Sequence, residues 1–123
     1  MTISFRHGNP TRQLDIVRVP FVFTDLSGVK TRPALVVSSF NAFNRSSRHF
    51  LAAMITSAAY SSFPLDVPLL HPFEAGLLKP CLVRMKLMTL VDTLILEKIG
   101  VLHENDRQGV MASLQKLLPF HEH

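Results

Sequence analysis

The chain of 123 residues is long enough for one domain with a buried core and too short for two. Apolar residues make up 47% of it and charged residues 18%, which excludes a disordered chain. Thirteen Lys and Arg against nine Asp and Glu give a formal net charge of +4, which favours an anionic partner.

The single cysteine, Cys81, excludes an intramolecular disulfide and points to no oxidising compartment. It falls in an apolar run, where we interpret it as a buried small hydrophobe rather than a nucleophile. The chain opens without the apolar run of a signal peptide, and no window reaches the roughly 18 apolar residues of a membrane span. We therefore expect a cytoplasmic protein.

Residues 1–13 are expected to form a flexible polar lead-in, and residues 14–123 a single domain. The first predicted element of this domain is a strand over residues 14–23. Val17, Val19, Phe21 and Phe23 alternate along this strand, the period expected when one face is buried. A second strand is expected at Ala34–Ser39. Between the strands, TDLSGVKTRP has turn residues and two cations, Lys30 and Arg32, and is expected to form a basic loop. Its part TDLSGVKT is expected to be a mobile cover, with Arg32 just past it.

Two long windows of the sequence contain cations and no acidic residue. The first lies between Asp25 and Asp66, and the second between Glu74 and Asp92. If they meet in space, they form a surface that could follow a phosphate backbone; scattered solvated cations are the alternative. Their cations are Lys30, Arg32, Arg45, Arg48, Lys79, Arg84 and Lys86.

The segment Phe40–Arg48, FNAFNRSSR, is expected to be a loop because its residues are small and polar. It mixes Phe40 and Phe43 with arginines, as single-stranded nucleic acid sites do for stacking and phosphate contact. The alternative is that both rings tuck beneath the loop as a satellite core.

Later segments predict further strands and a terminal helix. His49–Ser57 is nearly all apolar and therefore central, whereas Pro68 places the next strand at a sheet edge. Apolar residues recur at helical spacing from Val110, with Asn105 or Asp106 as the cap and Pro119 as the stop. The fold predicted is a small bent sheet or barrel with one helix. Its other strands are expected at Leu65–Leu70, Cys81–Leu90 and Glu97–Leu102.

Common catalytic signatures are absent from the sequence, which has no Gly-rich phosphate loop, GxSxG, CxxC or HExxH. Sequence patterns alone therefore indicate a basic, mostly β domain with nucleic-acid contacts, without an activity.

The run DIVRVPFVFTDLSGVKTRPALVVSS resembles the opening signature of the MazF/PemK toxin family, the ribonuclease components of bacterial toxin–antitoxin pairs. LAAMITS, LDVPL, AGLLKPCLVRMKLMTL and ILEKIGVL follow in the family's order, so the resemblance covers roughly residues 14–102. It implies an SH3-like barrel of the PemK/CcdB type with a C-terminal helix, usually a homodimer. It also implies cleavage of single-stranded RNA at selected sequences, without metal or other cofactor, and inhibition by a cognate antitoxin.

The resemblance places a catalytic arginine at Arg32 and a catalytic threonine at Thr56. The reaction implied is attack of a ribose 2′-OH on the adjacent phosphate, leaving a 2′,3′-cyclic phosphate and a 5′-OH. A guanidinium stays protonated, so Arg32 is expected to stabilise charge rather than act as a base. Thr56 is expected to orient the 2′-OH or donate to the phosphate, and His49 or Arg84 could complete the site. The expected RNA contacts are Lys30, Phe43, Arg45, Arg48, Ser57, Arg84 and Lys86.

The sequence also departs from the family pattern. FNAFNRSSRH lacks the acidic Asn-Asp step of many relatives, which affects the expected choice of RNA. Two alternatives remain: a CcdB-like toxin that binds gyrase through its C-terminal helix, and a relative on the same fold that binds nucleic acid or protein without cleaving.

Overall fold

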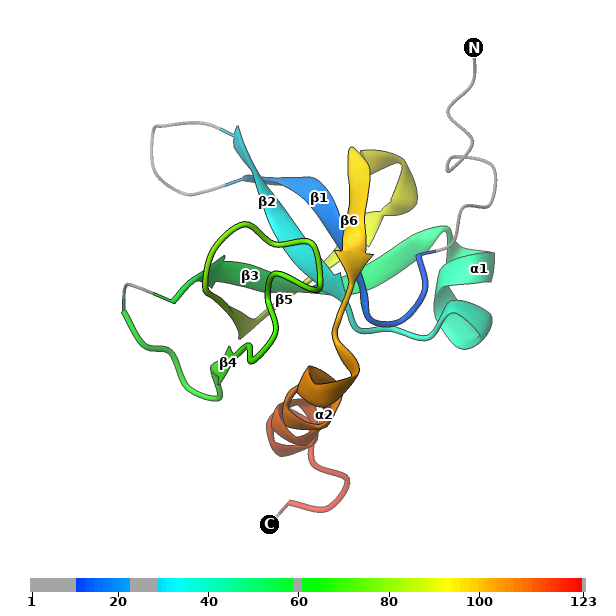
Figure 1. Ribbon diagram of the computed structural model, residues 1–123. Helices are drawn as coiled ribbons and strands as arrows, with labels where there is room; N and C mark the ends of the chain where they lie inside the picture. Colours follow the sequence, from blue (N-terminus) through cyan, green and yellow to red (C-terminus); the bar gives the residue numbers. More distant parts are fainter. Residues whose placement is uncertain (1–10, 23–28, 59–60, 123) are drawn as a thin grey trace.

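The computed structural model describes residues 11–22, 29–58 and 61–122 (Figure 1). Its six strands form one curled antiparallel sheet in the order β4-β5-β3-β2-β1-β6, with the helix α2 packed beside it. This confirms the predicted fold class. The elements are β1 (Asp15–Val22), β2 (Val29–Val36), η2 (Phe40–Asn44), α1 (Arg45–Ser47), β3 (His49–Ser57), β4 (Val67–Pro68), β5 (Cys81–Val91), η3 (Asp92–Leu94), β6 (Glu97–Val101) and α2 (Glu104–Leu117).

Both faces of the central strands are buried, which explains why these strands are almost continuously apolar. On one face, Ile16, Leu35 and Ile55 pack in a core that includes Val110 of α2. Val19 and Phe50 belong to a second cluster with the alternate residues of the same strands. β3 lies between β2 and β5, as its apolar sequence predicts.

β2 begins at Val29 instead of Ala34, so the prediction that Lys30 and Arg32 lie in a loop is wrong. The reason is pairing with β1, which matches Phe21 with Lys30 and Val19 with Arg32 and overrides the loop-like composition. Residues 23–28 lie outside the described residues, as does most of the basic cover predicted between the strands.

The predicted loop at Phe40–Arg48 is instead a π-helical turn followed by the short helix α1. Ser39 begins the turn because its hydroxyl accepts a hydrogen bond from the Ala42 N–H at 3.0 Å. The buried side chain of Asn44 ends it by bonding the Thr11 and Ser38 carbonyls. Small polar residues thus build this turn by capping each other's backbone groups.

α2 begins at Glu104, and its cap is His103 rather than Asn105 or Asp106. The His103 Nδ1 accepts a hydrogen bond from the Asn105 N–H at 3.1 Å. The buried Asp106 carboxylate instead accepts the N–H groups of Leu70 and His71, at 2.7 and 3.0 Å. α2 is therefore tied to the segment that follows β4. No helix within the described residues is long and apolar enough to cross a membrane.

The segment 71–80 crosses the sheet and inserts Ala75 and Leu77 into the core beside α2. Gly76 has a φ of +93°, and a Cβ at Gly100 would lie 2.1 Å from the Ala75 carbonyl oxygen. Only glycine accepts this backbone approach between the segment and β6. The predicted strand at Leu65–Leu70 shrinks to Val67–Pro68, at the sheet edge that Pro68 predicts.

The lead-in predicted over 1–13 is described only from Thr11 onward. Thr11 is buried, and the Gln13 amide donates to the Val37 carbonyl at 2.9 Å. These last residues of the lead-in therefore lie against the sheet.

Candidate active site

Strand register relates the two predicted catalytic residues, Arg32 and Thr56. The β2–β3 ladder pairs Ala34 with Met54 and ends there, where Pro33 has no N–H to donate. Arg32 and Thr56 each lie two residues beyond this last pair, one on each strand. Because side chains alternate along strands, both residues belong to the face that holds Ala34.

Both residues are half-buried at the end of a well-packed sheet. Val19, which pairs with Arg32, is fully buried, and Leu82, which pairs with Thr56, is 6% exposed. Each candidate side chain is therefore held by a strand with a buried neighbour, not by a free loop. Ser57 follows Thr56 at the end of β3, and the exposed Lys30 precedes Arg32 by two residues on β2.

Arg32 also lines a cavity of about 240 Å³ between β2 and the segment 71–80. Three cations line the cavity, and among the described residues no acidic side chain does. One of them, Arg18, is bonded to the Glu97 carboxylate at 2.7 Å. The lining residues are Arg18, Thr31, Arg32, Pro33, Gly76, Leu77, Leu78, Lys79, Cys81 and Ile99. Arg32 and Lys79 come from the two acid-free windows, so the windows meet here.

Cys81 is a buried thiol in this cavity wall, as predicted. Its Sγ donates to the Lys79 carbonyl oxygen at 3.2 Å. Burial raises the pKa of the Cys81 thiol, so the thiolate needed for nucleophilic chemistry is disfavoured.

Arg84 lies on β5 opposite Met54 and is engaged by Asp66. Its Nε and Nη2 donate to the two carboxylate oxygens at 3.1 and 3.0 Å, and Nη2 also donates to the Ser61 carbonyl at 2.8 Å. The hydrogen bond from Arg84 lowers the pKa of Asp66, and the same bond raises the pKa of Arg84. This geometry favours anchoring of residues 61–66 over the RNA contact predicted for Arg84.

Phe63 is a candidate RNA contact that the sequence patterns did not indicate. The ring is 38% exposed, and its centroid lies 5.5 Å from the Arg84 guanidinium carbon and 5.0 Å from the Lys86 Nζ. The predicted contact Lys86 thus shares an exposed aromatic surface with Phe63. The signal that could have found Phe63 is its place at the end of the first acid-free window.

The remaining predicted contacts lie at the other end of β3. Arg48 directly precedes this strand and Thr56 is near its last residue, so about 23 Å of strand separates them. Phe43 and Arg45 belong to η2 and α1 on the Arg48 side (Figure 1). His49, whose Nδ1 bonds the Ser47 carbonyl at 2.8 Å, begins β3 there and does not complete the Arg32 and Thr56 site.

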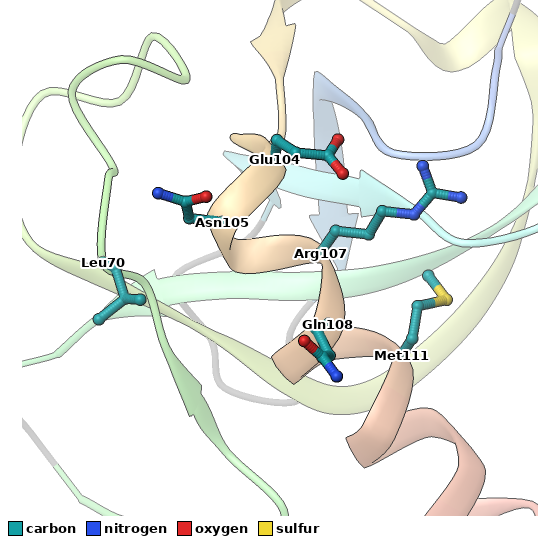
Figure 2. Close-up of a pocket in the computed structure, with 6 residues that line it drawn as sticks. All are labelled: Leu70, Glu104, Asn105, Arg107, Gln108 and Met111. Atoms are coloured by element: carbon teal, nitrogen blue, oxygen red, sulfur yellow. The ribbon is translucent and has the colours of Figure 1, made fainter.

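A larger cavity, of about 670 Å³, runs along the start of α2 (Figure 2). Figure 2 shows Glu104 and Arg107 extending in the same direction from the helix. Their opposite charges cancel, and no residue predicted for the site lines the cavity, which is formed by Leu70, Glu104, Asn105, Arg107, Gln108 and Met111. Within the described ranges, no group of three or more His, Cys, Asp or Glu residues could hold a metal ion.

Comparison with known proteins settles the family. The family model for the PemK-like, MazF-like toxin of type II toxin–antitoxin systems matches residues 12–118. The chain belongs to this toxin family. No curated protein matches the sequence well enough to serve as a relative.

Solved structures of MazF toxins share the fold. An endoribonuclease from a Mycobacterial species, in complex with its cognate antitoxin, is 19% identical with a TM-score of 0.67, covering 91% of this chain and 98% of that one. MazF in a MazE–MazF complex from Deinococcus radiodurans is 24% identical with a TM-score of 0.67, covering 89% and 97%. The Mycobacterium tuberculosis toxin MazF-mt6 is 17% identical with a TM-score of 0.66, covering 88% and 99%.

Proposed function

We propose that this MazF/PemK-family chain is an endoribonuclease that cleaves single-stranded RNA at selected sequences without a metal ion. The observation that carries the proposal is the β2–β3 register, because Arg32 and Thr56 each lie two residues beyond its last pair, Ala34 and Met54, and so belong to the same face of the sheet. Membership of the toxin family and the fold shared with proteins named endoribonucleases support it. Arg18, Arg32 and Lys79 around one cavity supply the positive field that RNA requires.

The proposed reaction is attack of the 2′-OH on the adjacent phosphorus, with departure of the 5′ oxygen to leave a 2′,3′-cyclic phosphate. Arg32 stabilises the negative charge that builds on the phosphorane, since its planar donors match two phosphate oxygens. The Thr56 hydroxyl orients the 2′-OH or donates to a phosphate oxygen, and Ser57 assists. Lys30 and Lys86 contact the RNA backbone on either side of this pair.

A cognate antitoxin is the proposed inhibitor, and the active form proposed is a cytoplasmic homodimer. Two of the similar structures are complexes of a toxin with its antitoxin, which supports an inhibitor that covers the RNA site. The proposed antitoxin segment is acidic, because Arg18, Arg32 and Lys79 all line the cavity that it would cover.

Cleavage of a labelled single-stranded RNA of mixed sequence in EDTA tests the proposal. Arg32→Ala should lower the cleavage rate by roughly 100-fold to 1000-fold, as loss of one oxyanion-stabilising donor does. Thr56→Val keeps the side-chain shape and removes the hydroxyl, so it should also impair cleavage. Arg107→Ala, on the exposed surface of α2, is the matched control and should cleave normally.

The RNA ends distinguish the proposed chemistry from alternatives. Fragments ending in a 2′,3′-cyclic phosphate support 2′-OH attack, whereas 3′-OH ends would overturn it. Intact RNA combined with inhibition of purified gyrase would replace the proposal with a CcdB-like toxin.

A further inference from the structure

A second cationic cavity lies at the junction of η2 and α1, at the opposite end of β3 from Thr56. We name this cavity of about 340 Å³ the elbow pocket, and its volume is in the range of small-ligand sites. Its lining residues are Thr11, Arg12, Phe40, Asn44, Arg45, Arg48 and Asp92. Arg12 is not among the RNA contacts predicted from the sequence, whereas Phe40 belongs to the predicted Phe40–Arg48 loop, whose rings and arginines are typical of single-stranded nucleic acid sites.

The elbow pocket has a formal charge of +2. Arg12, Arg45 and Arg48 contribute +3, and Asp92 contributes −1. The Arg48 Nε donates to the Asp92 carboxylate at 2.8 Å, so this carboxylate neutralises one guanidinium. An anionic ligand is favoured, in contrast to the α2 cavity, where Glu104 and Arg107 balance.

An aromatic ring places two of these guanidiniums beside each other. The Arg12 guanidinium carbon lies 4.4 Å from the Phe40 ring centroid, and that of Arg45 lies 5.7 Å from the same centroid. Both are within the range of cation–π attraction, which holds like charges closer than solvated arginines would stay. Phe43, 41% exposed, follows on the same turn.

Buried hydrogen bonds hold the backbone that carries these arginines. The Asn44 side chain, only 2% exposed, donates to the carbonyls of Thr11 and Ser38 and accepts from the Ser38 hydroxyl at 2.6 Å. Arg12 follows Thr11 and Arg45 follows Asn44, so one buried amide positions both. The pocket is thus a built feature and not a chance gathering of long side chains.

We propose that the elbow pocket binds a phosphate group of single-stranded RNA other than the one that is cleaved. This deepens the proposed function and rests on it for the identity of the polymer. Guanidinium forks match phosphate oxygens in pairs, and the arginine and Phe surfaces offer stacking planes for the attached bases. About 23 Å of β3 separates this phosphate from Thr56, so the pocket acts on affinity and on the choice of RNA.

Fluorescence anisotropy with a labelled, non-cleavable 2′-O-methyl RNA tests the pocket independently of cleavage. Arg12→Ala and Arg45→Ala should each weaken binding about 10-fold to 150-fold, as loss of a charge-assisted hydrogen bond does. Each should also lower the slope of log affinity against log salt by about 0.7. Arg107→Ala is the control and removes an exposed arginine from α2.

Arg12→Lys, the Arg107→Ala control and an acidic peptide distinguish a phosphate site from non-specific attraction and from a protein site. Arg12→Lys keeps the positive charge and loses the forked donors of the guanidinium. It should retain the slope of log affinity against log salt and the folded structure, and bind the RNA less tightly. An equal loss in Arg107→Ala would show non-specific attraction and overturn the pocket. Unchanged RNA affinity combined with weakened binding of an acidic peptide would overturn it in favour of a protein ligand.

Failure of the proposed function is visible separately. If the wild-type protein cleaves no RNA but Arg12→Ala still weakens RNA binding relative to Arg107→Ala, the pocket stands and the nuclease proposal falls. If the wild-type protein cleaves RNA and both pocket variants bind like wild type, the pocket assignment is wrong.

Discussion

Replacing Asp66 with Asn removes the carboxylate that pairs with the mostly buried Arg84 guanidinium. The two side chains are 12% and 11% exposed, and two hydrogen bonds join them. Removing one partner of a buried ion pair costs about 3 kcal/mol, because the other charge stays desolvated. For a chain of 123 residues this corresponds to a fall in melting temperature of about 12 °C.

The control is Glu97→Gln, which breaks the ion pair of Arg18. That pair is shorter, at 2.7 Å, but its side chains are 35% and 57% exposed, so the loss should stay below about 1 kcal/mol. Thermal melts at one protein concentration compare the two variants. Equal losses of stability in Asp66→Asn and Glu97→Gln would refute the argument that burial makes the Asp66–Arg84 pair the more stabilising one.

The pH dependence gives an independent check on Asp66. Its pKa in the folded protein lies below the ordinary 3.8, because the carboxylate is stabilised by Arg84. The pair therefore stabilises the fold fully above about pH 5, and this contribution is lost as the pH falls through the lowered pKa. The stability deficit of Asp66→Asn should shrink toward zero in acid; a deficit that stays constant from pH 7 to pH 2.5 contradicts the assignment.

Three further substitutions or reactions probe other parts of the fold. Gly100→Ala should lower the free energy of unfolding, measured by urea, by more than the roughly 1 kcal/mol of an ordinary backbone change, because its Cβ would overlap the Ala75 carbonyl; an unchanged urea midpoint argues against this contact. His103→Ala should cost about 1 kcal/mol in urea unfolding, whereas His103→Asn should restore the helix cap, and equal losses would exclude capping. The Cys81 thiol should react slowly with iodoacetamide at pH 7 in the folded protein and faster in urea, because its raised pKa and burial both oppose attack; rapid reaction in the folded state would show an accessible thiolate.

Strands were predictable wherever a buried face imposed its own pattern. β3 matches the predicted His49–Ser57, and β5 and β6 differ from prediction by one residue at their ends. β2 was predicted to begin five residues too late, at Ala34, and to end three residues too late, at Ser39. Its first residues, Val29–Pro33, are stabilised by cross-strand pairing, which composition does not reveal. The α2 cap was mispredicted for a different reason, because His103 is an uncommon capping residue.

The candidate site was predicted as a pair of residues and not as a surface. Arg32 and Thr56 follow from the family resemblance, and the register relates them. Lys79 lines the same cavity as Arg32, and Phe63 lies beside Lys86, only because two segments fold back on the sheet. Residues 61–66 are held by Arg84, and residues 71–80 by their glycine contacts. Such long-range placement leaves no periodic trace in the sequence.

Different interactions hold the cationic side chains at the two ends of β3. Near Thr56, Arg32 stands on a strand whose neighbours are fully buried, so its position is set by register and a slip of one residue would move it to the other face of the sheet. Near Arg48, by contrast, the buried Asn44 amide and the Phe40 ring hold Arg12 and Arg45 in place. In the proposed function, catalytic positioning therefore depends on strand register, and contact with the rest of the RNA depends on a buried amide and an aromatic ring.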